Sequence, residues 1–172
     1  MIYLLPIEEH RARASKIKVR FCLIVTSDSV IEGKRKDEVT PLVKELILSG
    51  GHELIGTAVV PNDESKIREA LNSFTSMCDV VVISGGTGLG SRDISVDTVK
   101  KLCTKDIPGY GELFRYLTFK KYGTAALATR ATACIYGQTL IFVTPGSVNA
   151  VKMALNELIL PEINHLVYEV KK

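Results

Sequence analysis

The sequence predicts an α/β fold built around a mostly parallel sheet. Short apolar runs alternate along the chain with segments whose apolar side chains recur at helical spacing, and this rhythm is typical of βαβ units. The run at 19–26 is almost continuously apolar, as strands covered on both faces are. With 172 residues, 46% of them hydrophobic and 24% charged, the chain is expected to form one domain with a substantial core.

The expected elements follow one another with short connections. In chain order they are a strand at 19–26, a helix at 37–49, a strand at 53–60, a helix that 61–63 introduce and that runs to about 74, a strand starting at 80, helices at 96–102 and 111–121, a strand at 139–144 and a helical segment at 148–170.

Glycine, proline and capping residues set the ends of these segments. Pro41 falls in the first turn of the first helix, and Gly50-Gly51 terminates that helix. Ser95 is expected to cap the helix at 96–102. Pro161 lies inside the last helical segment and is expected to break or kink it into two pieces.

A glycine-rich loop follows the strand that starts at Val80 and runs to the pair Arg92-Asp93. It contains Gly85, Gly86, Gly88 and Gly90. These glycines are expected to take positive φ and to expose backbone N–H groups, which suits binding of a polyphosphate. The spacing matches neither the P-loop nor the dinucleotide fingerprint. A tight strand-to-helix turn without a ligand is the alternative interpretation.

Polar residues come directly after the other expected strands. They are Ser27 and Asp28, Asn62 and Asp63, and Pro145, Gly146 and Ser147. Because ligands of open parallel sheets bind beyond the carboxyl ends of the strands, these residues and the glycine loop are expected to meet at one rim. Each group also has a structural interpretation, since such residues are common in turns and at helix N-caps.

Six segments in a fixed order carry a resemblance to known proteins. They are the glycine loop, Thr26-Ser27-Asp28-Ser29, Pro61-Asn62-Asp63, Pro108-Gly109-Tyr110-Gly111-Glu112, Ala128-Thr129-Arg130-Ala131 and Thr144-Pro145-Gly146-Ser147. Together they resemble the MoaB/MogA family of molybdenum cofactor biosynthesis, and the stretch that starts at Glu112 resembles the MoaB branch. The resemblance implies a three-layer α/β/α fold, with an N-terminal arm at 1–17 and a single molybdopterin-binding domain at 18–172.

The same resemblance implies an activity. The protein is expected to bind molybdopterin and MgATP, to adenylate the terminal phosphate of the pterin and to release pyrophosphate. Its relatives form homotrimers or homohexamers, and hand-over of the product to a MoeA-like protein is expected. A molybdopterin-binding protein without turnover is the alternative, and a purely structural oligomer is a third reading.

The resemblance also assigns roles to residues. Asp93 is expected to be catalytic and to hold Mg²⁺. Many relatives of this family carry an Asp where this chain has Asn62, so Asn62 is expected to be a metal ligand without charge. Asp63 or Glu64 is expected to supply the missing carboxylate. Asn62→Asp is expected to be tolerated. The expected substrate-binding residues are Ser27, Asp28, Ser84, Gly85, Gly86, Thr87, Gly88, Thr129, Arg130, Pro145, Gly146 and Ser147.

Two of these assignments have alternatives. Arg130 is a candidate for binding the phosphate of the pterin. Thr129 and Arg130 can instead belong to a strand edge, because β-branched residues favour strands. Arg92 can be a surface ion-pair partner of Asp93, which would contribute little energy.

Composition excludes several other classes of protein. The net charge of +3 is too small to indicate nucleic-acid binding. No apolar run reaches the length of a membrane-spanning helix, and no signal peptide is recognised, so a cytoplasmic location is expected. The cysteines Cys22, Cys78, Cys103 and Cys134 are far apart in the sequence and are expected to be buried free thiols.

Overall fold

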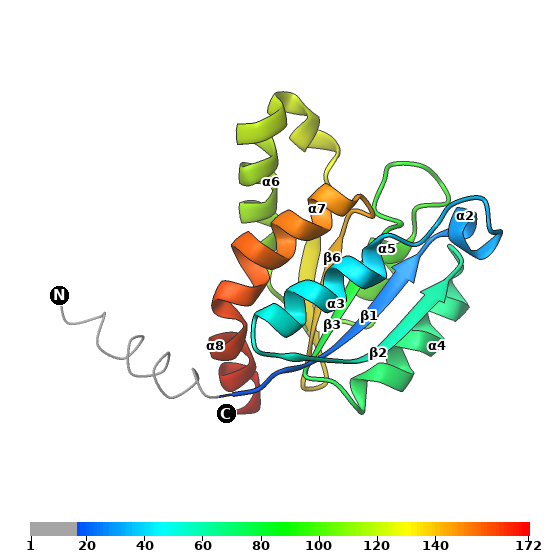
Figure 1. Cartoon of the computed structure of the whole chain (residues 1–172). Coiled ribbons are helices and arrows are strands. Elements are labelled where there is room, and N and C mark those ends of the chain that lie inside the picture. Colours follow the sequence, from blue (N-terminus) through cyan, green and yellow to red (C-terminus); the bar gives the residue numbers. More distant parts are fainter. Residues whose placement is uncertain (1–16) are drawn as a thin grey trace.

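A six-stranded sheet in the order β2-β1-β3-β6-β5-β4 forms the centre of the structure (Figure 1). The computed structural model describes residues 17–172, so the expected N-terminal arm lies almost wholly outside the described residues. The strands are β1 (Arg20–Thr26), β2 (Glu53–Val60), β3 (Val80–Ser84), β4 (Lys105–Asp106), β5 (Thr132–Tyr136) and β6 (Thr139–Thr144). The first three pair in parallel with each other or with β6, whereas β5 and β4 are antiparallel. The mostly parallel sheet is confirmed.

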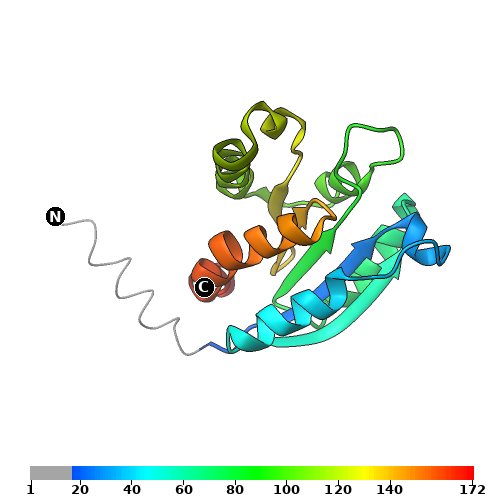
Figure 2. The same cartoon turned by 45° about the horizontal axis from the view of Figure 1, so that its top comes forward.

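Helices cover both faces of this sheet, as the three-layer expectation requires (Figures 1 and 2). The helices are α2 (Asp28–Ile31), α3 (Val39–Ser49), α4 (Glu64–Thr75), α5 (Ser95–Lys100), α6 (Pro108–Tyr122), the 3₁₀ helix η1 (Gly123–Ala128), α7 (Val148–Met153), the π-helix η2 (Ala154–Ile159) and α8 (Leu160–Lys171). Buried side chains of α3, α6, α7 and α8 form one apolar cluster, and those of α4 and α5 form the other. None of the described helices is long and apolar enough to cross a membrane.

The C-terminal segment stays helical through Pro161. A π-helical stretch, Ala154–Ile159, joins α7 to α8, and Pro161 lies in the first turn of α8. Proline lacks an N–H and its ring crowds the carbonyl four residues earlier, so a local change of helical hydrogen bonding accommodates it. The segment therefore does not break at Pro161, and the expected division into two pieces takes the form of a bend between α7 and α8 with a change of helix type (Figures 1 and 2).

Two further expectations are wrong in detail. Ser95 is the first residue of α5, not its N-cap, and its Oγ is buried without a partner in the described structure. The cysteines are paired, Cys22 with Cys78 and Cys103 with Cys134, and their Cα atoms lie 6.0 and 5.8 Å apart. The fold brings together residues that are 56 and 31 positions apart, which sequence spacing did not reveal.

A buried carboxylate fastens the amino end of β3 to β1 and to the last helix. Asp79 is 4% exposed, and it accepts hydrogen bonds from the backbone N–H and the guanidinium of Arg20 and from the ammonium of Lys171. Burial alone would raise the pKa of Asp79, but these hydrogen bonds outweigh it and lower the pKa from 3.8 to about 2.

Asp79→Asn is expected to lower the free energy of unfolding at pH 7 by about 2 kcal/mol. Because the pKa is lower in the folded state, the carboxylate stabilises the protein above pH 3.8, and this contribution is lost as the pH falls toward about 2. Denaturant unfolding of both proteins across this range tests the prediction. A difference as large at pH 2 as at pH 7 would contradict it.

Candidate ligand-binding site at the carboxyl ends of the strands

A cavity of about 480 Å³ lies at the carboxyl ends of β1 and β3, where the sequence predicted a common rim. The predicted site residues that line it are Ser27, Asp28, Asn62, Ser84, Gly85, Gly86, Thr87, Gly88, Asp93 and Gly146. Two cations, Arg35 and Arg92, also line it. Arg35 belongs to the basic run Lys34-Arg35-Lys36, and nothing in the local sequence pattern indicates that this loop folds back over the rim.

The glycines of the loop serve two different purposes. Gly85 and Gly86 have φ of 106° and 65°, in the left-handed region that favours glycine. Gly88 and Gly90 do not have positive φ, so the expectation is wrong for them. A Cβ on Gly88 would lie 2.6 Å from Asp93 Oδ2, and one on Gly90 would lie 3.0 Å from it. These two glycines therefore make room for the Asp93 carboxylate.

The main chain fixes Asp93 while its carboxylate stays available. Its N–H donates to Gly90 O at 3.0 Å, and its carbonyl accepts from Arg130 Nη1 at 3.3 Å. No hydrogen bond or ion pair from residues 17–172 reaches its carboxylate. A carboxylate held in place but unpaired at a cavity wall is suited to binding a cation.

Arg130 acts on the glycine loop from outside the cavity. Its Nη1 also donates to Gly88 O at 3.1 Å, and its Nη2 donates to Asp97 Oδ1 at 2.6 Å. The guanidinium therefore connects both ends of the loop that presents Asp93. Neither Arg130 nor Thr129 lies in a strand, since β5 begins at Thr132, so the strand-edge interpretation is wrong.

Asp28 is the most strongly held carboxylate of the cavity. Asn62 donates to it twice, from its backbone N at 2.9 Å and from its Nδ2 at 3.2 Å. Arg92 Nη2 lies 2.6 Å from Asp28 Oδ2, so Arg92 pairs with Asp28 and not with its neighbour Asp93. The hydrogen bonds from Asn62, with a smaller contribution from Arg92, hold the pKa of Asp28 below its usual value.

The two candidates for the missing carboxylate are engaged elsewhere. Asp63 Oδ1 accepts from Lys66 N at 3.0 Å and so caps α4. Glu64 forms ion pairs with Arg68 at 3.0 Å and with Lys101 at 2.6 Å. Neither residue lines the cavity, which favours the capping interpretation for Asp63.

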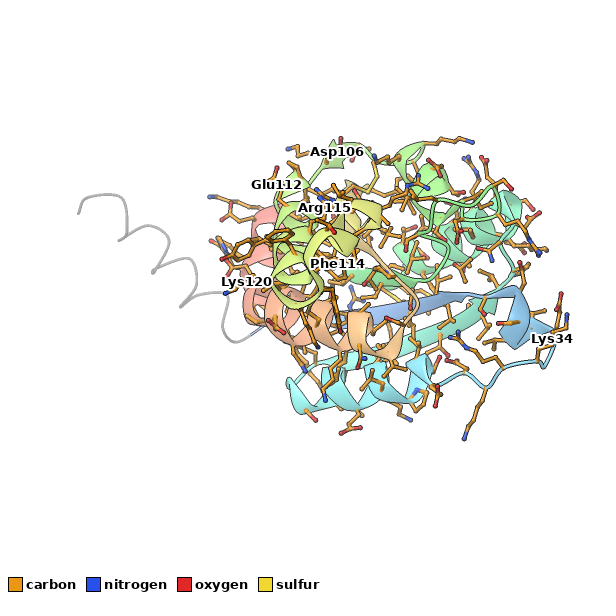
Figure 3. All side chains as sticks on the ribbon, turned by 90° about the horizontal axis from the view of Figure 1, so that it is seen from above. Lys34, Asp106, Glu112, Phe114, Arg115 and Lys120 are labelled. Atoms are coloured by element: carbon orange, nitrogen blue, oxygen red, sulfur yellow. A yellow bond between two sulfur atoms is a disulfide. The ribbon has the colours of Figure 1, made fainter. Side chains whose placement is uncertain are left out.

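The remaining predicted residues lie in two neighbouring cavities. Pro145, Ser147 and Thr129 line one of about 250 Å³, and Ser147 Oγ also caps α7 by accepting from Ala150 N at 3.2 Å. Thr129 and Arg130 line another of about 430 Å³, together with Lys100, Asp106 and Arg115. Figure 3 shows Asp106 and Arg115 near α6, with Lys34 at the opposite end of the molecule. The sequence reasoning missed Lys100 and Arg115, because nothing in the local pattern distinguishes them from surface cations.

The oxygen atoms of the first cavity fit a hard cation such as Mg²⁺ better than a metal that prefers sulfur or nitrogen ligands. Within residues 17–172 no group of three or more His, Cys, Asp or Glu side chains could hold a metal ion. The cavity instead offers the carboxylates of Asp28 and Asp93 and the buried, unpartnered Oδ1 of Asn62. Mg²⁺ is commonly bound by one or two carboxylates, with water and substrate phosphates completing its shell.

Comparison with known proteins identifies the family. Residues 22–165 match the family described as "Probable molybdopterin binding domain". The chain belongs to this family. It is 33% identical over 171 residues to molybdenum cofactor biosynthesis protein B of Bacillus subtilis, which covers 98% of this chain and 99% of that protein.

Solved structures of family members have the same fold. The tungsten cofactor synthesizing protein MoaB from Pyrococcus furiosus has a TM-score of 0.84 and 38% identity over 90% of this chain and 98% of its own. A structure of MogA has a TM-score of 0.80 at 23% identity, over 88% of this chain and 99% of its own, and so supports the fold alone. The family and the MogA-like fold expected from the sequence are thus confirmed.

Proposed function

We propose that this protein adenylates molybdopterin with MgATP. An oxygen of the pterin's terminal phosphate attacks the α-phosphorus of ATP, a new O–P bond forms, the bond from that phosphorus to the bridging oxygen breaks, and pyrophosphate leaves. The observation that carries the proposal is the unpaired Asp93 carboxylate, held beside the glycine loop at the cavity wall. The relatives named for molybdenum cofactor biosynthesis support the substrate class.

The chain's own groups would act by positioning and by charge. Backbone N–H groups of the loop around Gly85 and Gly86 are the donors suited to phosphate oxygens. Arg35 and Arg92 add positive charge at the wall, which favours polyanionic substrates. Asp93, with Asn62 Oδ1, would hold Mg²⁺, which when bound neutralises phosphate charge during phosphoryl transfer. No side-chain nucleophile is needed.

The direct test is turnover by the purified protein. It is incubated with molybdopterin and MgATP, and pyrophosphate and adenylated pterin are measured. Reactions without pterin, or with the metal chelated, serve as controls. Pyrophosphate that appears only in the complete reaction, with equimolar adenylated pterin, supports the proposal.

A pterin-binding protein without turnover is the second candidate. The uncharged Asn62 favours it, because the resemblance leads us to expect a carboxylate at this position and the chain has none there. Pterin binding without pyrophosphate release in the turnover experiment would select this candidate. In either case the product or ligand is expected to pass to a MoeA-like insertion protein in the cytoplasm, where ATP is available.

An exposed apolar face supports the proposal that copies of this chain assemble into a homotrimer or homohexamer. Large apolar side chains on α6 and η1 are more than half exposed, with Leu127 at 88%. They are Leu113, Tyr116, Phe119, Tyr122 and Leu127. Several of them border a groove of about 480 Å³. Contiguous apolar surface of this kind is typical of interaction sites.

Phe119→Asp is expected to lower the mass of the assembly, because a buried charge opposes association at an apolar contact. Light scattering measures the mass of both proteins. Leu48→Asp, at a similarly exposed apolar residue on α3, is the matched control and should leave the mass unchanged. A monomeric wild-type protein, or equal loss of mass in both variants, would contradict the assignment of this face.

A further inference from the structure

Two carboxylates line the cavity, and they differ in their surroundings. Among the described residues these are Asp28 and Asp93. Asp93 has no partner for its carboxylate within residues 17–172, whereas Asp28 is oriented by two hydrogen bonds from Asn62. Asp28 follows β1, and Asp93 follows the glycine loop after β3. Since β1 and β3 are adjacent parallel strands, the two carboxylates come from neighbouring positions of the same rim.

The amide of Asn62 explains why Asp28 can take part in binding a cation. Its Nδ2 is directed at Asp28 Oδ2, so its Oδ1 points elsewhere. That Oδ1 is buried without a partner, and a Cβ on Gly86 would lie 2.8 Å from it. Asn62 therefore contributes an amide to the orientation of Asp28 and leaves an unsatisfied oxygen beside the glycine loop. A buried oxygen without a hydrogen-bond partner destabilises the folded protein unless a ligand or a water molecule binds to it.

Two further unpartnered oxygens lie in the same wall. Thr26 is 4% exposed and Ser84 is 1% exposed, both line the cavity, and neither side-chain oxygen has a partner in the described structure. They end β1 and β3, the two strands that carry the carboxylates to the rim. The wall thus combines negative charge with several oxygens left without partners, which is the environment of a hydrated hard cation.

We propose that Asp28 is the second metal-binding carboxylate of this protein, acting with Asp93 in place of the acidic side chain that Asn62 lacks. The inference rests on the proposed function, which assigns Mg²⁺ to this cavity through Asp93. It replaces the assignment of Asp63 or Glu64, because both are engaged on α4. In this arrangement Asn62 positions Asp28 and offers its Oδ1 to the same ion.

The ion pair between Arg92 and Asp28 offers a way to distinguish a metal-binding role of Asp28 from a purely structural one. The guanidinium of Arg92, on a side chain that is 77% exposed, forms an ion pair with Asp28 Oδ2. A metal ion at Asp28 has to compete with this cation. Arg92→Gln is therefore expected to tighten the binding of Mn²⁺ alone, by about threefold or more, because one surface ion pair is weak but its removal frees the carboxylate. If Asp28 is not a ligand, Arg92→Gln will tighten metal binding no more than Arg35→Gln does, since each variant removes one cation from the same cavity wall.

The main test measures Mn²⁺ binding by electron paramagnetic resonance, without pterin or nucleotide, so that it does not depend on turnover. Asp28→Asn is expected to weaken binding at least about tenfold, because ligand charge sets the affinity of such sites. Glu69→Gln, which removes an exposed carboxylate on α4, is the matched control and should bind as the wild type does. Circular dichroism checks that each variant is folded.

A double variant that exchanges the residue types at positions 28 and 62 tests the metal site even if Asp28→Asn alone perturbs the loop. In Asp28→Asn/Asn62→Asp the cavity keeps two carboxylates, and one hydrogen bond between positions 28 and 62 can still form. This double variant is expected to bind Mn²⁺ within about threefold of the wild type. The structure limits the expectation that Asn62→Asp is tolerated. Asn62 Nδ2 lies 3.2 Å from Asp28 Oδ2, so the single variant would place two carboxylates side by side. It should therefore melt at a lower temperature without divalent cation and recover when Mn²⁺ is added.

The outcomes separate this inference from the proposed function. Weakening in both Asp28→Asn and Asp93→Asn, with recovery in the double variant, supports the inference. Weakening in Asp93→Asn but not in Asp28→Asn overturns it and leaves the proposed function standing. Unchanged binding in both variants overturns the metal site altogether, whatever the turnover experiment gives.

Discussion

Asp93→Asn is expected to lower kcat/KM for adenylyl transfer at least about 100-fold while leaving the fold intact. The amide has nearly the same shape as the carboxylate, so it fits the space that Gly88 and Gly90 leave, where a Cβ would lie 2.6 and 3.0 Å from Asp93 Oδ2. The backbone bonds to Gly90 and Arg130 do not involve the side chain and remain. The substitution therefore removes charge and little else.

The measurement compares the rate of pyrophosphate release with pterin binding. Because no hydrogen bond from residues 17–172 reaches the Asp93 carboxylate, the free energy of unfolding is expected to change by no more than about 0.5 kcal/mol. Pterin binding should also persist, since in the proposed function the metal would bind the phosphates of ATP and not the pterin. Turnover of Asp93→Asn at the wild-type rate would exclude the assigned role, whereas loss of both stability and turnover would mean that Asp93 is structural.

The central strands β1, β3 and β6 could be predicted because both of their faces are buried and apolar, whereas β2 at the sheet edge is partly exposed. β2 and β6 begin and end where the sequence predicts, and β1 begins one residue later. β5 was missed, since it is a short edge-side strand with only part of its surface buried. A signal for it was available: Gly137 has φ of 63° in the two-residue connection to β6, which is typical of a hairpin turn. β4 has only two residues and is defined by its pairing with β5, so it has no sequence pattern of its own that could predict it.

The rim of the site could be predicted, but not the engagement of each side chain. Strand ends converge as a rule of parallel sheets, so the residues after β1, β2 and β3 were found. Whether an aspartate caps a helix or lines a cavity depends on its rotamer and neighbours, as the contrast between Asp63 and Asp28 shows. The role of Arg130 could not be predicted either, because its hydrogen bonds to Gly88 and Asp97 join positions that are 33 or more residues apart in the sequence.

Gly85→Ala is expected to destabilise the protein by roughly 3 kcal/mol and to abolish ligand binding in the cavity. Gly85 has φ of 106°, a backbone conformation that L-residues rarely adopt. A Cβ there would also lie 2.3 Å from the carbonyl oxygen of Thr26, which is backbone and cannot rotate away. Gly146 packs against the same residue, since its own Cβ would lie 3.2 Å from Gly85 Cα, so the loop has little freedom to move aside.

The matched control is Gly33→Ala, which separates backbone strain from the steric clash. Gly33 also has positive φ, at 69°, but nothing lies within 4 Å of its Cβ position. Backbone strain alone should lower the free energy of unfolding by about 1 kcal/mol in Gly33→Ala. The additional loss in Gly85→Ala then measures the steric clash between the glycine loop and β1. Denaturant unfolding gives both values. Equal losses in the two variants would show that the loop can shift away from Thr26, and the tight packing of the cavity wall inferred from this contact would then be wrong.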